Sequence, residues 1–502
     1  MKQSPLLTIN QLSVAIQGQS YVKDLSLKIY PGQRLGLVGP SGAGKSLTAK
    51  AIMHFIHQGD LEIRGEIIYQ GLGNLLDLPT KEAQKILPQE IAVIQQEALD
   101  SLNPHYTIAA QLELIMEQFQ AEVPKADYPK VFQQVLEQVN LSQTDQVLAA
   151  KPAQLSGGMK QRVGIAMALL QKPKLILADE PTTALDQANQ VSFVRLIKAL
   201  SEKEEIAVLF ISHNLELVSQ LCSDIVIIDQ GRTIESNTTK ALFNHPKAPT
   251  TKRLVQSADY RKQASQNFQS QLPQAAQPLL RTEHLSLTYP GAHNPVLQDV
   301  NLELYPGEFV GLVGPSGSGK SSLAKLVTGL YPPSQGTIYL NGKALAPEQL
   351  SDFQAIQMIF QNPYQAFDPT YKMLVNLREL EKIPWVKARY ASQAAFYERI
   401  NHLAQHLHIS EDLMDKYPRQ LSGGQSQRFA ILRILLTQCP VIVADEIFSA
   451  LDYDIALELV QLLKDLRDKQ SFTLLFISHD LAMVKILCQR IYQIEDGKVI
   501  AQ

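Results

Sequence analysis

The amino-acid sequence predicts an α/β protein that contains two copies of one domain. Three observations support this fold class: the length of the chain, a series of motifs that occurs twice in the same order, and short apolar runs that lead either into a glycine-rich loop or into a pair of acidic residues. Such runs are typical of buried parallel strands, whose carboxyl ends meet at one edge of a sheet.

Length and composition bound the possible answers. The 502 residues predict two to four domains at about 100–200 residues per domain, and 45% hydrophobic with 19% charged residues is ordinary for a globular protein. The formal net charge of −3 gives no large attraction to nucleic acid, so we expect no nucleic-acid partner. The three cysteines form no CxxC pair, which argues against a disulfide framework or a zinc site.

The chain has no segment typical of membrane proteins. Its N-terminal stretch lacks the apolar centre of a signal peptide, and no apolar run approaches the ~18 residues that a membrane-spanning helix requires. We therefore expect no direct insertion into a membrane and a cytoplasmic location, unless a partner holds the chain elsewhere.

The motif series shows that the chain repeats itself. GPSGAGKS begins at Gly39 and GPSGSGKS at Gly314, and each is followed by a glutamine, an LSGG sequence, an apolar run ending in Asp-Glu, and a histidine. From the glutamine onward, paired motifs are 265 or 266 residues apart, which indicates two copies of one unit. The stretch between loop and glutamine is ten residues longer in the first copy, which predicts an insertion around residues 57–85.

A glutamine-rich stretch separates the copies. Residues 257–278 contain six glutamines, two prolines and few large apolar side chains, which is typical of a linker. We therefore predict a first domain at residues 1–256, a linker at 257–278 and a second domain at 279–502.

Local patterns predict the elements around the motifs. RLGLVGP and EFVGLVGP are apolar runs followed by sequences with helical spacing, which indicates strand, glycine loop and helix. KLILADE and VIVADE indicate buried parallel strands that end in two acids. The final IYQIEDGKVIAQ predicts two short strands around an Asp496-Gly497 turn.

Both glycine loops satisfy G-x-x-x-x-G-K-[ST], in which glycines let consecutive backbone N–H groups approach phosphate oxygens at a helix N-terminus. A chance glycine turn is the alternative for a single match, but two matches in the same context favour nucleotide binding. The lysines would neutralise the β- and γ-phosphates, and the final serines would coordinate Mg²⁺. The predicted nucleotide contacts are Gly39, Pro40, Ser41, Gly42, Ala43, Gly44, Lys45 and Ser46, and Gly314, Pro315, Ser316, Gly317, Ser318, Gly319, Lys320 and Ser321.

The acidic pairs predict the catalytic groups. Asp179 and Asp445 would hold the Mg²⁺ shell, and Glu180 and Glu446 would polarise the attacking water as general bases. Adjacent acids at the end of a strand could instead cap a turn. Their place 24 residues after LSGG in both copies favours the catalytic reading.

Together these residues resemble the ATP-binding cassette (ABC) ATPases, with two cassettes fused in one chain. The resemblance implies that each cassette has a RecA-like core, a β subdomain and an inserted helical subdomain, between Gln96 and Leu155 and again between Gln361 and Leu421. It implies ATP and Mg²⁺ as ligands, with Gln96 and Gln361 contributing to catalysis and to the metal shell. His213 and His479, which could otherwise be structural, would sense the γ-phosphate.

The resemblance also implies that the cassettes close head to tail over two ATP molecules. Ser422, Gly423 and Gly424 would then complete the site of Lys45, and Ser156, Gly157 and Gly158 that of Lys320. The loops Ala184–Asp186 and Ala450–Asp452 would lie between the sites.

Two positions depart from the family pattern. Ile447 replaces the proline usual after the catalytic glutamate, and Ile16 or Gly18 stands where an adenine-stacking aromatic residue is expected. Tyr289 fits that stacking role in the second cassette. In the first, Tyr21 is either a substitute or simply a half-buried strand residue.

The text around the glutamines suggests a subtype. QEALDSLNP, QNPYQAFDP and HPKAPTTKRLV look like the D-type and F-type ATPase subunits of oligopeptide, dipeptide and nickel importers. This implies two integral-membrane permease subunits and, through them, a substrate-binding protein as partners, at the cytoplasmic face of the inner membrane. Two alternatives stay open: a permease-free, translation-associated ABC protein, and the ATPase of an exporter or of a vitamin or cobalt uptake system.

Overall fold

The computed structural model describes residues 4–40, 42–54, 61–94, 102–182, 187–268, 270, 277–292, 294–315, 317–448, 451, 453–470 and 472–501. The chain divides into two units, residues 1–258 and 259–502. Among the described residues, no helix is both long and apolar enough to cross a bilayer.

Two sheets form the centre of the first unit. An antiparallel sheet has the order β2-β1-β4-β5, and a six-stranded sheet has the order β10-β9-β3-β8-β7-β6. All neighbours in the larger sheet are parallel except β9 and β10. The strands are β1 (Leu7–Ile16), β2 (Gln19–Ile29), β3 (Arg34–Val38), β4 (Leu61–Tyr69), β5 (Gly73–Asn74), β6 (Ile91–Ile94), β7 (Leu175–Asp179), β8 (Ala207–Ser212), β9 (Asp224–Asp229) and β10 (Arg232–Thr238).

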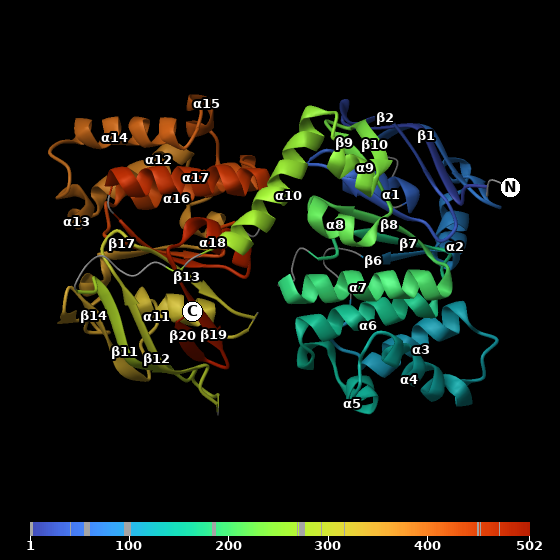
Figure 1. Cartoon of the computed structure of the whole chain (residues 1–502), viewed down its shortest axis with the longest axis horizontal. Coiled ribbons are helices and arrows are strands. Elements are labelled where there is room, and N and C mark those ends of the chain that lie inside the picture. Colours follow the sequence, from blue (N-terminus) through green and yellow to red (C-terminus); the bar gives the residue numbers. More distant parts are fainter. Residues whose placement is uncertain are drawn as a thin grey trace. The chain divides into compact units, whose positions relative to one another are not determined.

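Helices cover the large sheet of the first unit. Figure 1 shows α3, α4 and α5 gathered beyond α6 and α7 at one end of this unit, while β1 and β2 lie at its other end. The helices are α1 (Lys45–Ile52), α2 (Thr80–Glu90), α3 (Ile108–Phe119), α4 (Tyr128–Gln138), α5 (Thr144–Ala149), α6 (Gly157–Leu170), α7 (Gln187–Glu204), α8 (Leu215–Leu221), α9 (Thr239–Asn244) and α10 (Pro249–Asn267).

The second unit repeats both sheets, with the orders β12-β11-β14-β15 and β16-β17-β18-β13-β19-β20. Its strands are β11 (Leu280–Leu287), β12 (Leu297–Leu304), β13 (Phe309–Val313), β14 (Gln335–Leu340), β15 (Lys343–Ala344), β16 (Ile356–Ile359), β17 (Val441–Asp445), β18 (Thr473–Ile477), β19 (Arg490–Glu495) and β20 (Lys498–Ala501). Its helices are α11 (Lys320–Val327), α12 (Met373–Arg378), α13 (Pro384–Lys387), α14 (Gln393–His406), α15 (Glu411–Met414), α16 (Gly423–Leu436), α17 (Tyr453–Gln470) and α18 (Leu481–Leu487).

The apolar strands are buried on both faces. Along β7, Leu175 and Leu177 pack into the core that includes α1, whereas Ile176 and Ala178 pack into the core that includes the helical subdomain. This explains why the strand reads as a continuous apolar run rather than as an alternating one. The predicted fold of core, β subdomain and inserted helices is therefore confirmed for both cassettes.

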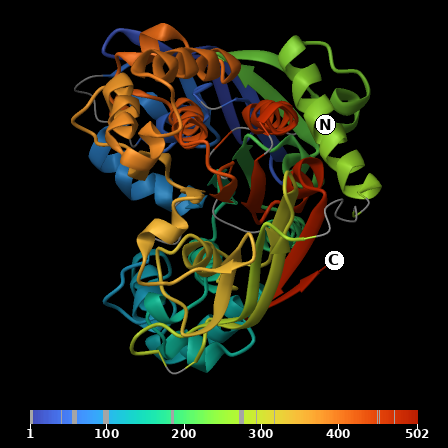
Figure 2. The same cartoon turned by 90° about the vertical axis from the view of Figure 1, so that its left-hand side faces the viewer.

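The predicted turn at Asp496-Gly497 joins β19 to β20, with φ of 47° and 74°. Gly497 lies so close to β12 that a Cβ atom would meet the Val296 carbonyl oxygen at 2.5 Å, and its own carbonyl accepts the Gln298 N–H at 2.8 Å. Figure 2 shows the red C-terminal strand beside the yellow-green strands of this subdomain. The hairpin thus fastens the small sheet to the large one.

The two units differ where the lengths of the motif intervals differ. The first unit has the eleven-residue helix α2 before β6, whereas the second has only a short 3₁₀ helix, Leu350–Phe353, before β16. The structure differs from expectation at the end of the first unit. Helix α10 continues to Asn267, so the segment predicted as a linker begins as the end of a helix.

The SLNP and FDP sequences have a local structural role. The buried amide of Gln111 accepts the Asn103 N–H and donates to the carbonyls of Asn103 and Tyr106. Asn376 makes the same contacts with Asp368 and Tyr371. These contacts hold the loop that enters each helical subdomain. Some of the residues that suggested the importer subtype therefore also have a role in folding.

Helices α6 and α16 meet the acidic strand differently. In the first unit, the buried Gln161 side chain donates its Nε2–H to the Pro181 carbonyl at 2.8 Å. In the second, Ile447 stands at the proline position, and the buried Nε2 of Gln427 has no hydrogen-bond partner among the described residues. An unpaired buried amide destabilises a fold, whereas a paired one does not.

We predict that Gln161→Leu destabilises the first unit by about 1–2 kcal/mol, because it leaves the Pro181 carbonyl without its donor. The matched Gln427→Leu should be neutral or stabilising, because it removes a group that has no described partner. Urea unfolding of the full chain, followed by hydrogen exchange in peptides from each unit, measures both effects. Equal losses for the two variants would contradict this explanation.

Candidate functional site

Each phosphate loop follows a buried strand and ends in a helix. Gly44 caps α1 with φ of 96°, and a Cβ atom there would meet the Tyr21 carbonyl oxygen at 2.8 Å. Gly319 caps α11 with φ of 103°, and a Cβ atom would meet Leu297 Cδ2 at 2.8 Å. Both the backbone conformation and the close approach therefore require glycine. Ser41 and Ser316 lie outside the described residues.

The loop lysines are buried and reach back over their own loops. Lys45 is 6% exposed and donates to the carbonyls of Gly39 and Pro40 at 2.7 and 3.0 Å. Lys320 is 5% exposed and donates to Gly314 and Pro315 at 2.9 and 2.8 Å. Each ammonium is therefore fixed at the centre of its loop, where it favours an anionic ligand.

Oxygen atoms that suit Mg²⁺ lie beside each loop. The Ser46 hydroxyl donates to Asp179 Oδ1 at 3.1 Å. Burial raises the pKa of Asp179 and of Asp445, which fits carboxylates placed to receive a positive charge. Oδ1 of Asp445 is buried without a hydrogen-bond partner among the described residues. A hydroxyl and a carboxylate form a donor set that Mg²⁺ accepts, so these residues fit the predicted metal.

The glutamates that follow these aspartates share an unusual backbone conformation. Glu180 and Glu446 have φ of 47° and 49°, in the left-handed region that costs a residue with a Cβ about 1 kcal/mol or more. Their N–H groups donate to the carbonyls of Ile211 and Ile477 at 3.0 and 2.9 Å, which continues the pairing with the next strand. No residue pattern in the sequence predicts this left-handed backbone conformation.

The conformation brings each glutamate to its histidine. Nδ1 of His213 lies 3.0 Å from Glu180 Oε1, and Nδ1 of His479 lies 3.4 Å from Glu446 Oε1. The sequence separated these residues by 33 positions, and the structure brings them together in both units. The contact holds each carboxylate in one orientation, which suits the predicted role of a general base.

The glutamine of the second unit also reaches the glutamate. Gln361 donates its Nε2–H to Glu446 Oε2 at 2.9 Å, so it lies beside the glutamate predicted to be the general base. Its predicted part in the metal shell stays a prediction. Gln96 and the residues 184–186, 450 and 452 of the two intervening loops lie outside the described residues.

The LSGG turns form exposed helix starts. Ser156 caps α6 and accepts the Met159 N–H at 3.3 Å, and Ser422 caps α16 and accepts the Gln425 N–H at 3.3 Å. Both serines and the glycines that follow them, Gly157 and Gly423, are exposed, while Gly158 and Gly424 are half-buried. Each turn thus offers a hydroxyl and free helix-start N–H groups to an anionic ligand.

A pair of tyrosines stands beside the second loop. Tyr289 Oη lies 3.0 Å from Ser322 Oγ, and its ring meets that of Tyr331 edge-on at a centroid distance of 5.2 Å. Tyr331 was not predicted, although it lies only four residues after the last residue of α11. The stacking roles of Tyr289 and Tyr21 stay predictions.

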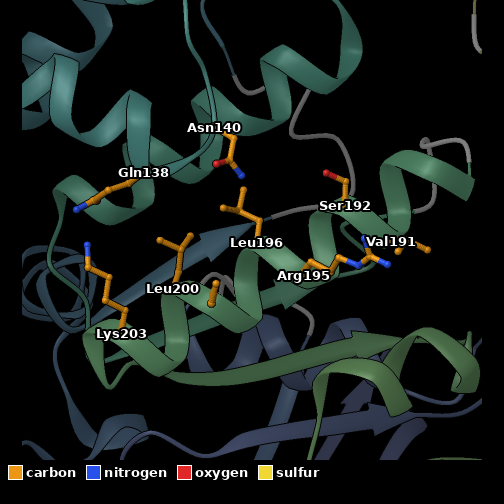
Figure 3. Close-up of a pocket in the computed structure, with 9 residues that line it drawn as sticks. Gln138, Asn140, Val191, Ser192, Arg195, Leu196, Leu200 and Lys203 are labelled. Carbon is orange, nitrogen blue, oxygen red and sulfur yellow. The ribbon is translucent and has the colours of Figure 1, made fainter.

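A surface hollow of about 400 Å³ lies between the end of α4 and α7, and its lining includes none of the predicted nucleotide contacts (Figure 3). Asn140, Ser192, Arg195 and Lys203 are among the residues that line it. Arg162 lies in α6, the helix that begins at the LSGG turn, here called the signature helix. It donates to the Asn140 carbonyl and to Ser192 Oγ at 2.7 and 3.2 Å. This region therefore joins the helical subdomain to the core.

The arrangement of two phosphate loops, each with an adjacent aspartate, glutamate and histidine, defines a P-loop ATPase with two sites in one chain. Comparison with known proteins gives the family: residues 22–183 and 297–449 match the ABC transporter family. The chain belongs to this family and is an ATPase with two fused ATP-binding cassettes, which confirms the prediction.

Two relatives span nearly the whole chain. It is 34% identical to the uncharacterized ABC transporter ATP-binding protein YejF of Escherichia coli K12, over 99% of this chain and 95% of YejF. It is 32% identical to the glutathione import ATP-binding protein GsiA of the same organism, over 99% of this chain and 85% of GsiA. Each relative is thus similar to this chain along both of its cassettes.

A chain in the crystal structure of archaeal ribosomal stalk protein aP1 with archaeal ribosome recycling factor aABCE1 superposes with a TM-score of 0.59 and 21% identity. The match covers 93% of this chain and 85% of that one. At this identity the likeness shows the fold alone.

We predict that His479 titrates above the usual histidine range, because its hydrogen bond to Glu446 raises its pKa and lowers the pKa of Glu446. The stabilisation by this pair is therefore complete below the unfolded histidine's pKa of about 6.5 and is lost as pH rises through the raised value. On the acid side, it is lost as pH falls through the lowered pKa of Glu446. NMR titration of labelled histidines, with His479 assigned through His479→Gln, measures the shift.

Glu446→Gln should return the pKa of His479 toward the ordinary range. Glu495→Gln, which changes an exposed carboxylate of the same unit, is the matched control. An unchanged His479 titration in Glu446→Gln would contradict the assigned contact.

Proposed function

We propose that this protein is the ATP-hydrolysing, energy-coupling subunit of an importer for peptides or for chelated metals such as nickel complexes. It acts at the cytoplasmic face of the inner membrane, bound to two permease subunits that receive solute from a substrate-binding protein. Nucleotide-driven closure of the two cassettes moves the permease.

The single observation that carries this proposal is that both units keep the full set of ATPase groups. Each has a buried loop lysine, a strand-end aspartate and a glutamate in contact with a histidine. Two complete sets favour a motor that uses two ATP molecules. The relatives support the proposed direction and solute class: GsiA is named for import of glutathione, a small peptide, and its alignment covers 99% of this chain.

The exposed LSGG turns support a crossed arrangement. In each unit the turn presents N–H groups and a hydroxyl at the start of a long helix, with no burial of its serine. In the proposed sandwich, Ser422, Gly423 and Gly424 complete the site of Lys45, and Ser156, Gly157 and Gly158 that of Lys320. Triphosphate then holds the units together, because it binds only the closed state fully.

The residues divide the work of hydrolysis. Lys45 and Lys320 attract and orient the β- and γ-phosphates, and Tyr289 stacks on adenine in the second site. Glu180 and Glu446 accept a proton from the attacking water, each held by its histidine at the contact described above. Ser46 and Asp179 in the first site, and Ser321 and Asp445 in the second, would hold Mg²⁺, which when bound would neutralise charge on the phosphates. Gln96 and Gln361 begin the segments that report site occupancy to the permease.

The crossed arrangement predicts that Ser422→Ala lowers hydrolysis at the Lys45 site more than at the Lys320 site, by about tenfold, since it removes one donor to a charged group. Site-resolved trapping of labelled nucleotide in the full chain measures the effect. Ser156→Ala is the matched control and should show the reverse preference. If each serine acts on the site of its own unit, the crossed pairing is wrong.

Transport tests the importer proposal itself. Vesicles that contain this chain and its two proposed permease subunits should take up short peptides such as glutathione in an ATP-dependent manner. The Lys45→Ala, Lys320→Ala double variant should abolish uptake, because both loop charges are lost. Uptake confined to nickel chelates would select the other proposed solute class. Association with ribosomes in place of permease would contradict the proposal.

A further inference from the structure

The side chain of Tyr364 connects the segment that begins at Gln361, here called the glutamine segment, to the LSGG turn of the same unit, here called the signature turn. Tyr364 lies in a short 3₁₀ helix, Pro363–Ala366, and its Oη donates to the Leu421 carbonyl at 3.0 Å. Leu421 directly precedes Ser422, the cap of α16. The start of the 3₁₀ helix is itself fixed, because Asn362 Oδ1 accepts the Tyr364 N–H at 3.0 Å.

The other end of the same segment reaches the catalytic glutamate. Gln361, three positions before Tyr364, donates to Glu446 Oε2 at 2.9 Å. One short segment thus carries two side-chain hydrogen bonds, one to the second ATPase site and one to the backbone of the signature turn. A displacement of this segment that breaks one bond changes the position from which the other is made.

The first unit has a different residue at the position of Tyr364, and that position lies outside the described residues. The position 265 residues before Tyr364 is Leu99, in the same frame that pairs Asn103 with Asp368 and Gln111 with Asn376. A leucine side chain has no hydrogen-bond donor. A hydroxyl at this position, which can link the glutamine segment to the signature turn, is therefore present in the second unit and absent at Leu99 in the first.

We propose that Tyr364 is a positioning residue that transmits the state of the Gln361–Glu446 pair to the Ser422 turn. In the crossed arrangement proposed above, on which this inference rests, the Ser422 turn completes the site of Lys45. Tyr364 therefore joins the hydrolytic centre of one ATP site to the wall of the other. Binding at the two sites is coupled reciprocally, but only one of the two possible routes contains this hydroxyl.

The test uses the full chain in two backgrounds, each of which leaves one site able to hydrolyse ATP. Glu446→Gln leaves the Lys45 site active, and Glu180→Gln leaves the Lys320 site active. Tyr364→Phe should lower kcat at the Lys45 site about fivefold, the factor that one ordinary hydrogen bond supplies, and change kcat at the Lys320 site less than about twofold. Tyr371→Phe is the matched control, because Tyr371 is exposed and its hydroxyl binds no described residue.

A second measurement separates transmission from local support of the turn. In the Glu446→Gln background, Gln361→Ala should also slow the Lys45 site, and adding Tyr364→Phe should cause no further loss, because both changes interrupt one route. Independent, multiplicative losses would overturn the proposal, as would equal losses at both sites or no loss from Tyr364→Phe.

The same assay distinguishes this inference from the arrangement on which it rests. Ser422→Ala in the Glu446→Gln background should slow the Lys45 site. If it does not, the crossed arrangement fails. If it does and Tyr364→Phe has no effect, only the role of Tyr364 fails.

Discussion

The register of the parallel strands is the constraint on which both ATPase sites depend. In the first unit, β8 pairs with β3 and β7 so that Ser212 lies opposite Val38 and Ile211 lies opposite Asp179. The loop after β3, the acids at the end of β7 and the histidine after β8 therefore meet at one edge of the sheet. The Glu180 N–H extends this pairing by one residue, and the left-handed backbone that results aims the carboxylate at His213. The second unit repeats the arrangement with Asp445 opposite Ile477.

The sequence predicted the parts of this site whose chemistry is tied to spacing. A loop glycine that must adopt a left-handed conformation, or an acid that ends an apolar run, leaves a local pattern, so Gly44 and Asp179 could be found without coordinates. The conformation of Glu180 and Glu446 leaves none, because it is imposed by a hydrogen bond to a strand about thirty residues further along the chain. The ring contact of Tyr331 with Tyr289 likewise depends on packing between distant segments. Helix α10 extends into glutamine-rich sequence, whose composition does not oppose helix formation.

Duplication of the fold has not preserved the same contacts around the two sites. Pro181 accepts a hydrogen bond from Gln161, whereas Ile447 leaves Gln427 without a described partner. The signature-helix arginine binds Ser192 in the first unit, and its counterpart Arg428 binds Glu458 at 2.9 Å in the second. Leu99 and Tyr364 differ in the hydroxyl that reaches the signature turn. None of these differences changes the lysine, aspartate, glutamate or histidine of either site. They change the contacts that support each site, and both sites keep the groups proposed for ATP hydrolysis.

The proposed head-to-tail closure of the two units around ATP is tested most directly by spin-label distances. Labels at Lys50→Cys and Arg419→Cys, and separately at Lys325→Cys and Ala153→Cys, report the two crossed pairs at exposed positions, while the three native cysteines are buried. In the Glu180→Gln, Glu446→Gln variant, which lacks both proposed general bases, both distances should shorten when ATP and Mg²⁺ are added. If neither distance shortens while ATP is bound, the proposed closure is contradicted.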